Sequence, residues 1–111
     1  MQEAAADIAD LTWGAMANTV ILAMGVVRGE YVQQGMSLAG KGGQVIVTAM
    51  GPYDQVTTDL SLFELTLLQK RIQGAIFGGV GPRTQIPKLL NLYRSGALKL
   101  DELVTKTYKL E

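Results

Sequence analysis

Three short apolar runs constrain the fold of this chain more than any other feature. They cover residues 19–24, 44–50 and 72–77, and none of them shows a strict alternation of hydrophobic and polar residues. A strand has this composition when both faces of its sheet are covered, as in parallel sheets. Because helical patterns separate the runs, the sequence predicts an α/β domain with about three parallel strands and flanking helices.

The segments between the runs predict helices at residues 3–17, 30–39, 62–70 and 87–95. Ser61 and Glu64 have the spacing of a capping box, which places the start of the third helix at residue 62. Gly40 is expected to cap the second helix, after which a glycine pair turns the chain. Pro87 suits the first turn of the last helix. Residues 100–111 predict a short helical turn. It is followed by a stretch of alternating hydrophobic and polar residues, which would need another strand to pair with.

The composition excludes several classes of function. The 111 residues hold ten basic and ten acidic side chains without a basic stripe, which argues against nucleic acid and membrane partners. The chain has no cysteine and no histidine, so disulfides, thiolate metal sites and a histidine base are excluded. No apolar stretch is long enough to span a bilayer and no signal peptide is recognisable, which predicts a cytoplasmic protein.

Two glycine-rich segments are candidates for a phosphate-binding loop. Residues 35–42 nearly match a P-loop, but Gly42 stands where a serine or threonine would hold magnesium. This segment also ends a predicted helix and precedes a strand, which is the reverse of the P-loop context. Gly78, Gly79 and Gly81 follow the third apolar run without completing a dinucleotide fingerprint. They predict a flexible strand exit where a ligand can approach the backbone.

No set of side chains supports catalysis. Asp101 and Glu102 lie at a predicted helix start, where negative charge complements the helix dipole. Glu64 is explained by its cap, none of the four tyrosines has a lysine four residues later, and Trp13 is predicted to be a core residue. The sequence therefore predicts no catalytic residue and no metal ligand within this chain.

The most specific pattern lies in the second half of the chain. The residues are Val-Ile-Val-Thr-Ala-Met-Gly-Pro at 45–52, Arg-Ile-Gln-Gly-Ala-Ile-Phe-Gly-Gly at 71–79 and Ile-Pro-Lys-Leu-Leu at 86–90. With residues 96–105, this pattern resembles the zinc-type (medium-chain) NAD-dependent alcohol dehydrogenases. Residues 12–14 and 62–65 are most similar to the bacterial branch of nitrosoaniline-dependent and thiol-linked formaldehyde dehydrogenases.

The resemblance implies that residues 1–98 form the second mononucleotide-binding half of a doubly wound (Rossmann) sheet. Residues 99–111 would lead back to a catalytic domain that is absent from this chain. In the family, the backbone at these strand ends holds the nicotinamide half of NAD. By alignment, the cofactor-binding residues are Ala23, Met24, Val47, Ala49, Ala75 and Phe77.

Two functional hypotheses follow. In the first, the chain is part of an NAD-dependent zinc alcohol dehydrogenase that oxidises a primary alcohol or a thiol–formaldehyde adduct. Zinc then belongs to the complete parent alone, and NAD binds this fragment weakly or not at all because the phosphate-binding half is missing. In the second, the chain is a non-catalytic, self-associating α/β fragment. A natural truncation, a misassigned start and an engineered domain are each consistent with the sequence.

The resemblance also implies self-association. In the family, the strand equivalent to residues 72–77 pairs antiparallel with its twin from a second subunit. Loss of the neighbouring central strand would in addition leave residues 19–24 as an unpaired apolar edge. We therefore expect a homo-oligomer that forms through the strand at residues 72–77.

Overall fold

The computed structural model describes residues 2–110. These residues divide into two compact units, one up to residue 78 and one from residue 79 onward. The first unit contains α1 (Gln2–Leu11), β1 (Ala17–Leu22), α2 (Gly29–Leu38), β2 (Ala39–Val47), α3 (Leu62–Leu67) and β3 (Arg71–Gly74). A short 3₁₀ turn, η1 (Phe77–Gly79), leads into the second unit, which contains α4 (Pro82–Arg94) and the 3₁₀ turn η2 (Asp101–Leu103). The predicted division between residues 1–98, the nucleotide-binding half, and residues 99–111, the segment leading to a catalytic domain, stays a prediction.

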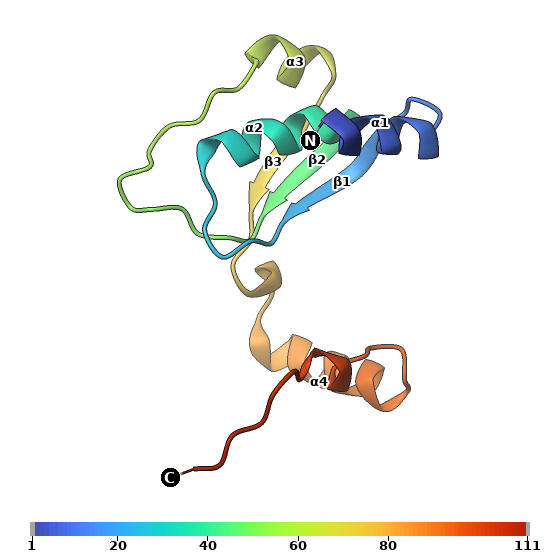
Figure 1. Cartoon of the computed structure of the whole chain (residues 1–111), viewed down its shortest axis with the longest axis vertical. Coiled ribbons are helices and arrows are strands. Elements are labelled where there is room, and N and C mark those ends of the chain that lie inside the picture. Colours follow the sequence, from blue (N-terminus) through green and yellow to red (C-terminus); the bar gives the residue numbers. More distant parts are fainter. Residues whose placement is uncertain (1, 111) are drawn as a thin grey trace. The chain divides into compact units, whose positions relative to one another are not determined.

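The three strands form one parallel sheet in the order β1-β2-β3, which confirms the predicted α/β class (Figure 1). Leu22 of β1 lies beside Val47 of β2, and Val47 lies beside Gly74 of β3. Right-handed crossovers place the connecting helices α2 and α3 on the same face of such a sheet, and α2 packs on β1 and β2. No helix in the described part of the chain is long and apolar enough to cross a membrane.

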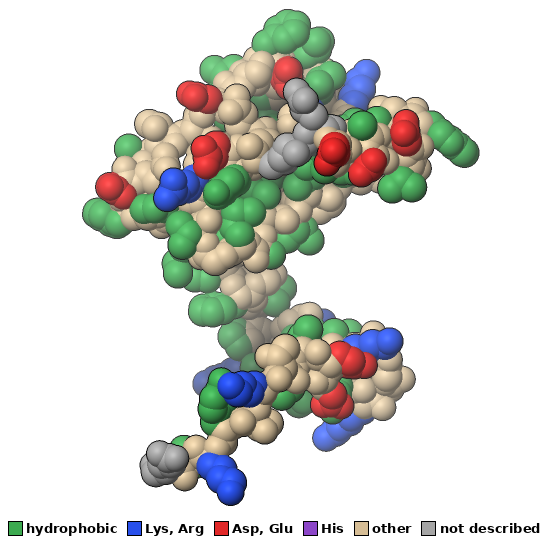
Figure 2. Space-filling model, viewed as in Figure 1, with side chains coloured by type: hydrophobic (Ala, Val, Ile, Leu, Met, Phe, Trp, Pro, Cys, Tyr) green, Lys and Arg blue, Asp and Glu red, His purple; other side chains and the backbone are tan. Residues whose placement is uncertain are grey.

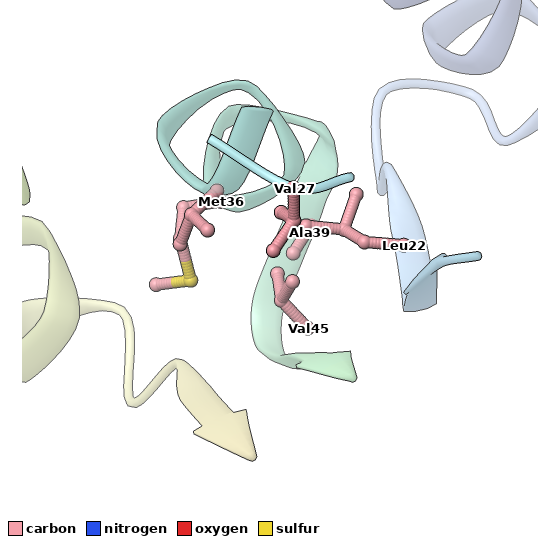
Figure 3. Close-up of a cluster of buried hydrophobic side chains, with 6 residues drawn as sticks. Leu22, Val27, Met36, Ala39 and Val45 are labelled. Carbon is pink, nitrogen blue, oxygen red and sulfur yellow. The ribbon is translucent and has the colours of Figure 1, made fainter. Parts of the chain in front are cut away.

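The core lies between α2 and the sheet (Figure 3). Its buried side chains are Leu22, Val27, Val32, Met36, Ala39 and Val45. Val45 is fully buried in the central strand. A Cβ on Gly35 of α2 would lie 3.3 Å from Val45 Cγ1, so the missing side chain lets α2 approach the sheet closely. Burial of these apolar groups is the main force that holds the first unit together.

The first helix is shorter than predicted, because α1 ends at Leu11 and not at residue 17. Trp13, Gly14 and Met16 all have positive φ angles, which a right-handed helix does not allow. The Thr12 hydroxyl donates to Ile8 O (2.6 Å) and accepts from Met16 N (2.9 Å), so it stabilises this exit. The prediction that Trp13 is a core residue is wrong, since its side chain is 98% exposed.

The expected helix cap at Gly40 is also wrong. Helix α2 ends at Leu38, and β2 begins at Ala39 and runs through Gly40, Gly42 and Gly43. The strand register shifts between Ala17 and Thr19, opposite these glycines. The glycines therefore do not form a turn between elements. They allow an irregular start of β2 close to the backbone of the loop that precedes β1.

The remaining boundaries differ by a few residues. Ser61 caps α3 by accepting a hydrogen bond from Glu64 N (3.2 Å), as predicted, but α3 ends at Leu67. β3 stops at Gly74, so the predicted strand end at Phe77 lies in the η1 turn. Helix α4 begins at Pro82, and Pro87 lies inside it and not in its first turn. The alternating stretch forms no strand between residues 104 and 110.

Candidate functional site

The carboxyl ends of the three strands meet at one edge of the sheet, and hydrogen bonds fix their spacing. Ala75 N donates to Val47 O (2.9 Å), which joins the exit of β3 to the end of β2. The amides of Thr48 and Ala49 both donate to Leu22 O, at 3.1 and 3.2 Å, which joins the exit of β2 to the end of β1. Ligands of open α/β sheets bind at such an edge.

A further set of backbone contacts joins the chain segments just beyond this edge. Val26 forms a parallel bridge with Met50, and Val27 N donates to Met50 O (3.1 Å). The two segments that leave β1 and β2 therefore stay paired after the strands end. Backbone hydrogen bonds therefore hold the segments at this edge in fixed positions relative to one another.

A pocket of about 300 Å³ opens at the exits of β2 and β3. Its lining is mostly apolar and consists of Val47, Thr48, Ala49, Met50, Gly74, Ala75 and Ile76. Three of the six residues predicted to bind the cofactor, Val47, Ala49 and Ala75, thus converge on one pocket. The small residues Ala49, Gly74 and Ala75 leave the backbone accessible to a flat group.

The other three predicted residues do not line this pocket. Ala23 and Met24 directly follow β1 and are exposed. Phe77 is 86% exposed and has a φ of +49°, a left-handed conformation that costs free energy for an aromatic residue. Such backbone strain is concentrated at functional sites in proteins.

A pocket of about 290 Å³ that the sequence did not indicate lies beside the start of α2. The apolar part of its lining includes Val27, Val32, Val47 and Val56, and Arg28 and polar loop residues also line it. The signal for this pocket is weak in the sequence, because residues 51–61 form no helix or strand and their path cannot be deduced from periodicity.

The polar chemistry of the chain is sparse. Among residues 2–110, no cluster of acidic side chains could hold a metal ion. In the second unit, Tyr93 Oη donates to both carboxylate oxygens of Asp101, at 2.8 and 2.9 Å. This hydrogen bond and the negative charge of Asp101 raise the pKa of Tyr93 above its usual value of 10.0. Tyr93 therefore keeps its proton at neutral pH and cannot act there as a base.

The chain is similar in sequence and in fold to alcohol dehydrogenases. No protein-family model matches the chain. It is 43% identical over 109 residues to the NDMA-dependent alcohol dehydrogenase of Amycolatopsis methanolica, which covers 98% of this chain and 29% of the relative. The crystal structure of benzyl alcohol dehydrogenase from Acinetobacter calcoaceticus superposes with a TM-score of 0.80 at 29% identity, covering 93% of this chain and 27% of that enzyme.

The chain is homologous to a segment of the zinc-type medium-chain alcohol dehydrogenases. It spans less than a third of the length of the curated relatives that it matches. The nucleotide-binding subdomain of the PpsC enoylreductase domain from Mycobacterium tuberculosis shares the same fold, with a TM-score of 0.62 at 21% identity over 89% of this chain and 56% of that one. The homology thus concerns part of the cofactor-binding domain.

Proposed function

We propose that this chain is the second half of the cofactor domain of a cytoplasmic, NAD-dependent zinc alcohol dehydrogenase. The complete enzyme would oxidise a primary alcohol or a thiol–formaldehyde adduct. One observation carries the proposal. The segment that is 43% identical to an alcohol dehydrogenase brings Val47, Ala49 and Ala75 to one pocket at the carboxyl edge of its sheet.

The hydrogen bonds at the edge support a role toward NAD for each of these backbone groups. The Ala75 amide already donates to Val47 O, so Ala75 presents its carbonyl, which can accept a hydrogen bond from a carboxamide NH₂. Phe77 follows two residues later in a left-handed conformation, and its amide would donate to the carboxamide oxygen. Val47 and Ala49 would pack against the ring and ribose. When bound, NAD would supply the hydride acceptor for alcohol oxidation, and these residues would orient its ring and exclude water from it.

The residues of this chain do not fit a zinc site. Protein zinc sites use cysteine, histidine and carboxylate ligands. The chain has neither cysteine nor histidine, and among residues 2–110 no carboxylates cluster closely enough to bind a metal. In this proposal the zinc ligands and the phosphate-binding loop come from other parts of a longer protein.

A segment exchange tests the proposal. Residues 2–110 replace the matching segment of the NDMA-dependent alcohol dehydrogenase of Amycolatopsis methanolica, and the chimera is assayed for NADH binding and alcohol oxidation. We expect it to bind NADH within about tenfold of the parent enzyme. A chimera that folds, as judged by circular dichroism, but does not bind NADH would overturn the proposal and favour the non-catalytic fragment.

Blocking the pocket gives a sharper prediction within this chimera. Ala75→Trp places an indole where the nicotinamide ring is expected, and we expect NADH affinity to fall by about a hundredfold or more. The matched control is Ala6→Trp on the exposed side of α1, which should leave affinity unchanged. Fluorescence titration of NADH measures both. Equal affinities for the two variants would place the ring elsewhere.

We also propose that the chain self-associates through β3. All four residues of Arg71–Gly74 are exposed, and β3 is an edge of the sheet. Hydrophobic side chains are also exposed in both units (Figure 2), among them Ile21 and Ile72. An open strand edge with apolar neighbours favours pairing with another chain.

Light scattering tests this self-association. At tens of micromolar we expect a mass of at least twice 11.9 kDa. Because Ala75 N points toward β2, the alternation of amides makes Ile72 N point away from the sheet. Ile72→Pro removes that outward donor and should shift the mass toward the monomer, whereas Gln73→Ala should not. A monomeric mass for the unchanged chain would contradict the proposal.

A further inference from the structure

The carbonyl of Leu22, at the end of β1, accepts hydrogen bonds from three donors. Two are the main-chain amides of Thr48 (3.1 Å) and Ala49 (3.2 Å). The third is the side-chain hydroxyl of Thr48, at 3.0 Å. A parallel ladder alone accounts for the Thr48 amide. The Ala49 amide and the hydroxyl are additional, and both come from the first two residues that follow β2.

These additional bonds fix how the chain leaves β2. The Ala49 amide turns back toward β1 to reach the Leu22 carbonyl, so the backbone bends at Thr48 and directs Ala49 and Met50 along the rim of the pocket. A threonine side chain has few allowed rotamers, and its bond to Leu22 O selects one of them. The hydroxyl therefore links side-chain conformation to the spacing of the two strand ends.

The location of Thr48 makes this bond relevant to binding. Thr48 lines the same pocket as Val47, Ala49 and Ala75, yet it is exposed and is not part of the core. Removal of its hydroxyl should thus affect the rim more than the stability of the sheet. A threonine retained only for its strand propensity would be replaceable by valine, which is equally β-branched.

We propose that Thr48 is a positioning residue of the cofactor edge. Its hydroxyl holds the Leu22 carbonyl and thereby sets the distance between the exits of β1 and β2. This keeps Ala49 in place against the flat ring of a nicotinamide. The inference rests on the proposed function and adds to it a residue that touches the strand end and not the reacting atoms.

Two substitutions in the chimera separate the hydroxyl from the shape of the side chain. Thr48→Val keeps the branched shape and removes the donor, and we expect NADH affinity to fall about three- to tenfold, the effect of one lost hydrogen bond. Thr48→Ser keeps the donor and should remain within about twofold of the unchanged chimera. The KM for NAD should rise in Thr48→Val with little change in kcat. Equal affinities for the valine and serine variants would overturn the proposal.

Amide hydrogen exchange in the 111-residue chain tests the role of Thr48 without depending on cofactor binding. In Thr48→Val the Ala49 amide should exchange about three- to tenfold faster, while the Leu65 amide, bonded to Ser61 O in α3, stays unchanged. Unchanged exchange at Ala49 would overturn the role of Thr48 whatever the chimera does. A chimera that never binds NADH would instead overturn the proposed function, and exchange at Ala49 would still decide whether Thr48 sets the edge.

Discussion

Replacing Gly40 by alanine is expected to destabilise the chain by about 3 kcal/mol or more, one of the largest effects of any single methyl group in this fold. Gly40 is buried at the start of β2, and a Cβ there would overlap the carbonyl oxygen of Ala15. The Ala15 carbonyl belongs to the backbone, so the clash is not relieved by the movement of a flexible side chain. Urea unfolding followed by far-UV circular dichroism measures the loss, because the exposed Trp13 is a poor reporter.

The loop that Gly40 faces has little freedom to retreat. Ala15 N donates to Thr12 O (3.0 Å), and Met16 N donates to the Thr12 hydroxyl (2.9 Å). The backbone of Gly40 itself has no positive φ, so alanine could adopt its conformation. The expected cost therefore comes from the close approach of two chain segments and not from local backbone strain.

Gly25→Ala is the matched control for this prediction. A Cβ on Gly25 meets no atom within 4 Å, and its φ is not positive. The substitution should be neutral, or should stabilise the chain by up to about 1 kcal/mol through the unfolded state. Protein concentration must be the same for all variants, since self-association would add to the apparent stability. Similar unfolding midpoints for Gly40→Ala and Gly25→Ala would contradict the packing that we describe.

Gly40 also illustrates which parts of the fold the sequence could predict. The apolar runs predicted three parallel strands correctly, because burial on both faces leaves a composition that is visible in a short window. Glycine signals both helix ends and close backbone contacts, so Gly40 was predicted to be a cap although it lies in a strand. Trp13 and Phe77 adopt left-handed backbone conformations shortly after α1 and β3 end, and their residue types give no signal of this.

The sequence could also predict where part of the candidate site lies. Val47, Ala49 and Ala75 follow strand ends, and parallel strands bring their carboxyl ends to one edge, so their convergence could be expected from topology. The hydrogen bond from the Thr48 hydroxyl to Leu22 O depends on how the backbone turns as it leaves β2. No periodicity in the sequence encodes such a turn, so this contact could not be predicted from the residue pattern.

Lys70→Met is expected to destabilise the chain by about 2 kcal/mol, although methionine is apolar and of similar length. Lys70 is the buried charged residue of the described part of the chain, with a side chain only 4% exposed. Its ammonium donates to Met36 O at 2.7 Å. Met36 lies in the last turn of α2, where carbonyl groups have no partner within the helix. The substitution leaves that carbonyl buried without a donor, and urea unfolding measures the cost.

Glu64→Gln distinguishes this hydrogen bond from an ion pair. Glu64 Oε2 lies 3.9 Å from the Lys70 ammonium, but its side chain is 55% exposed. Exposed pairs of this kind contribute little, so the expected loss is below about 0.5 kcal/mol. If Glu64→Gln costs as much as Lys70→Met, the ion pair and not the helix carbonyl holds the lysine. We expect a larger loss for Lys70→Met than for Glu64→Gln. In that case the hydrogen bond of Lys70, the residue just before β3, to the end of α2 helps to fix where this edge strand joins the sheet.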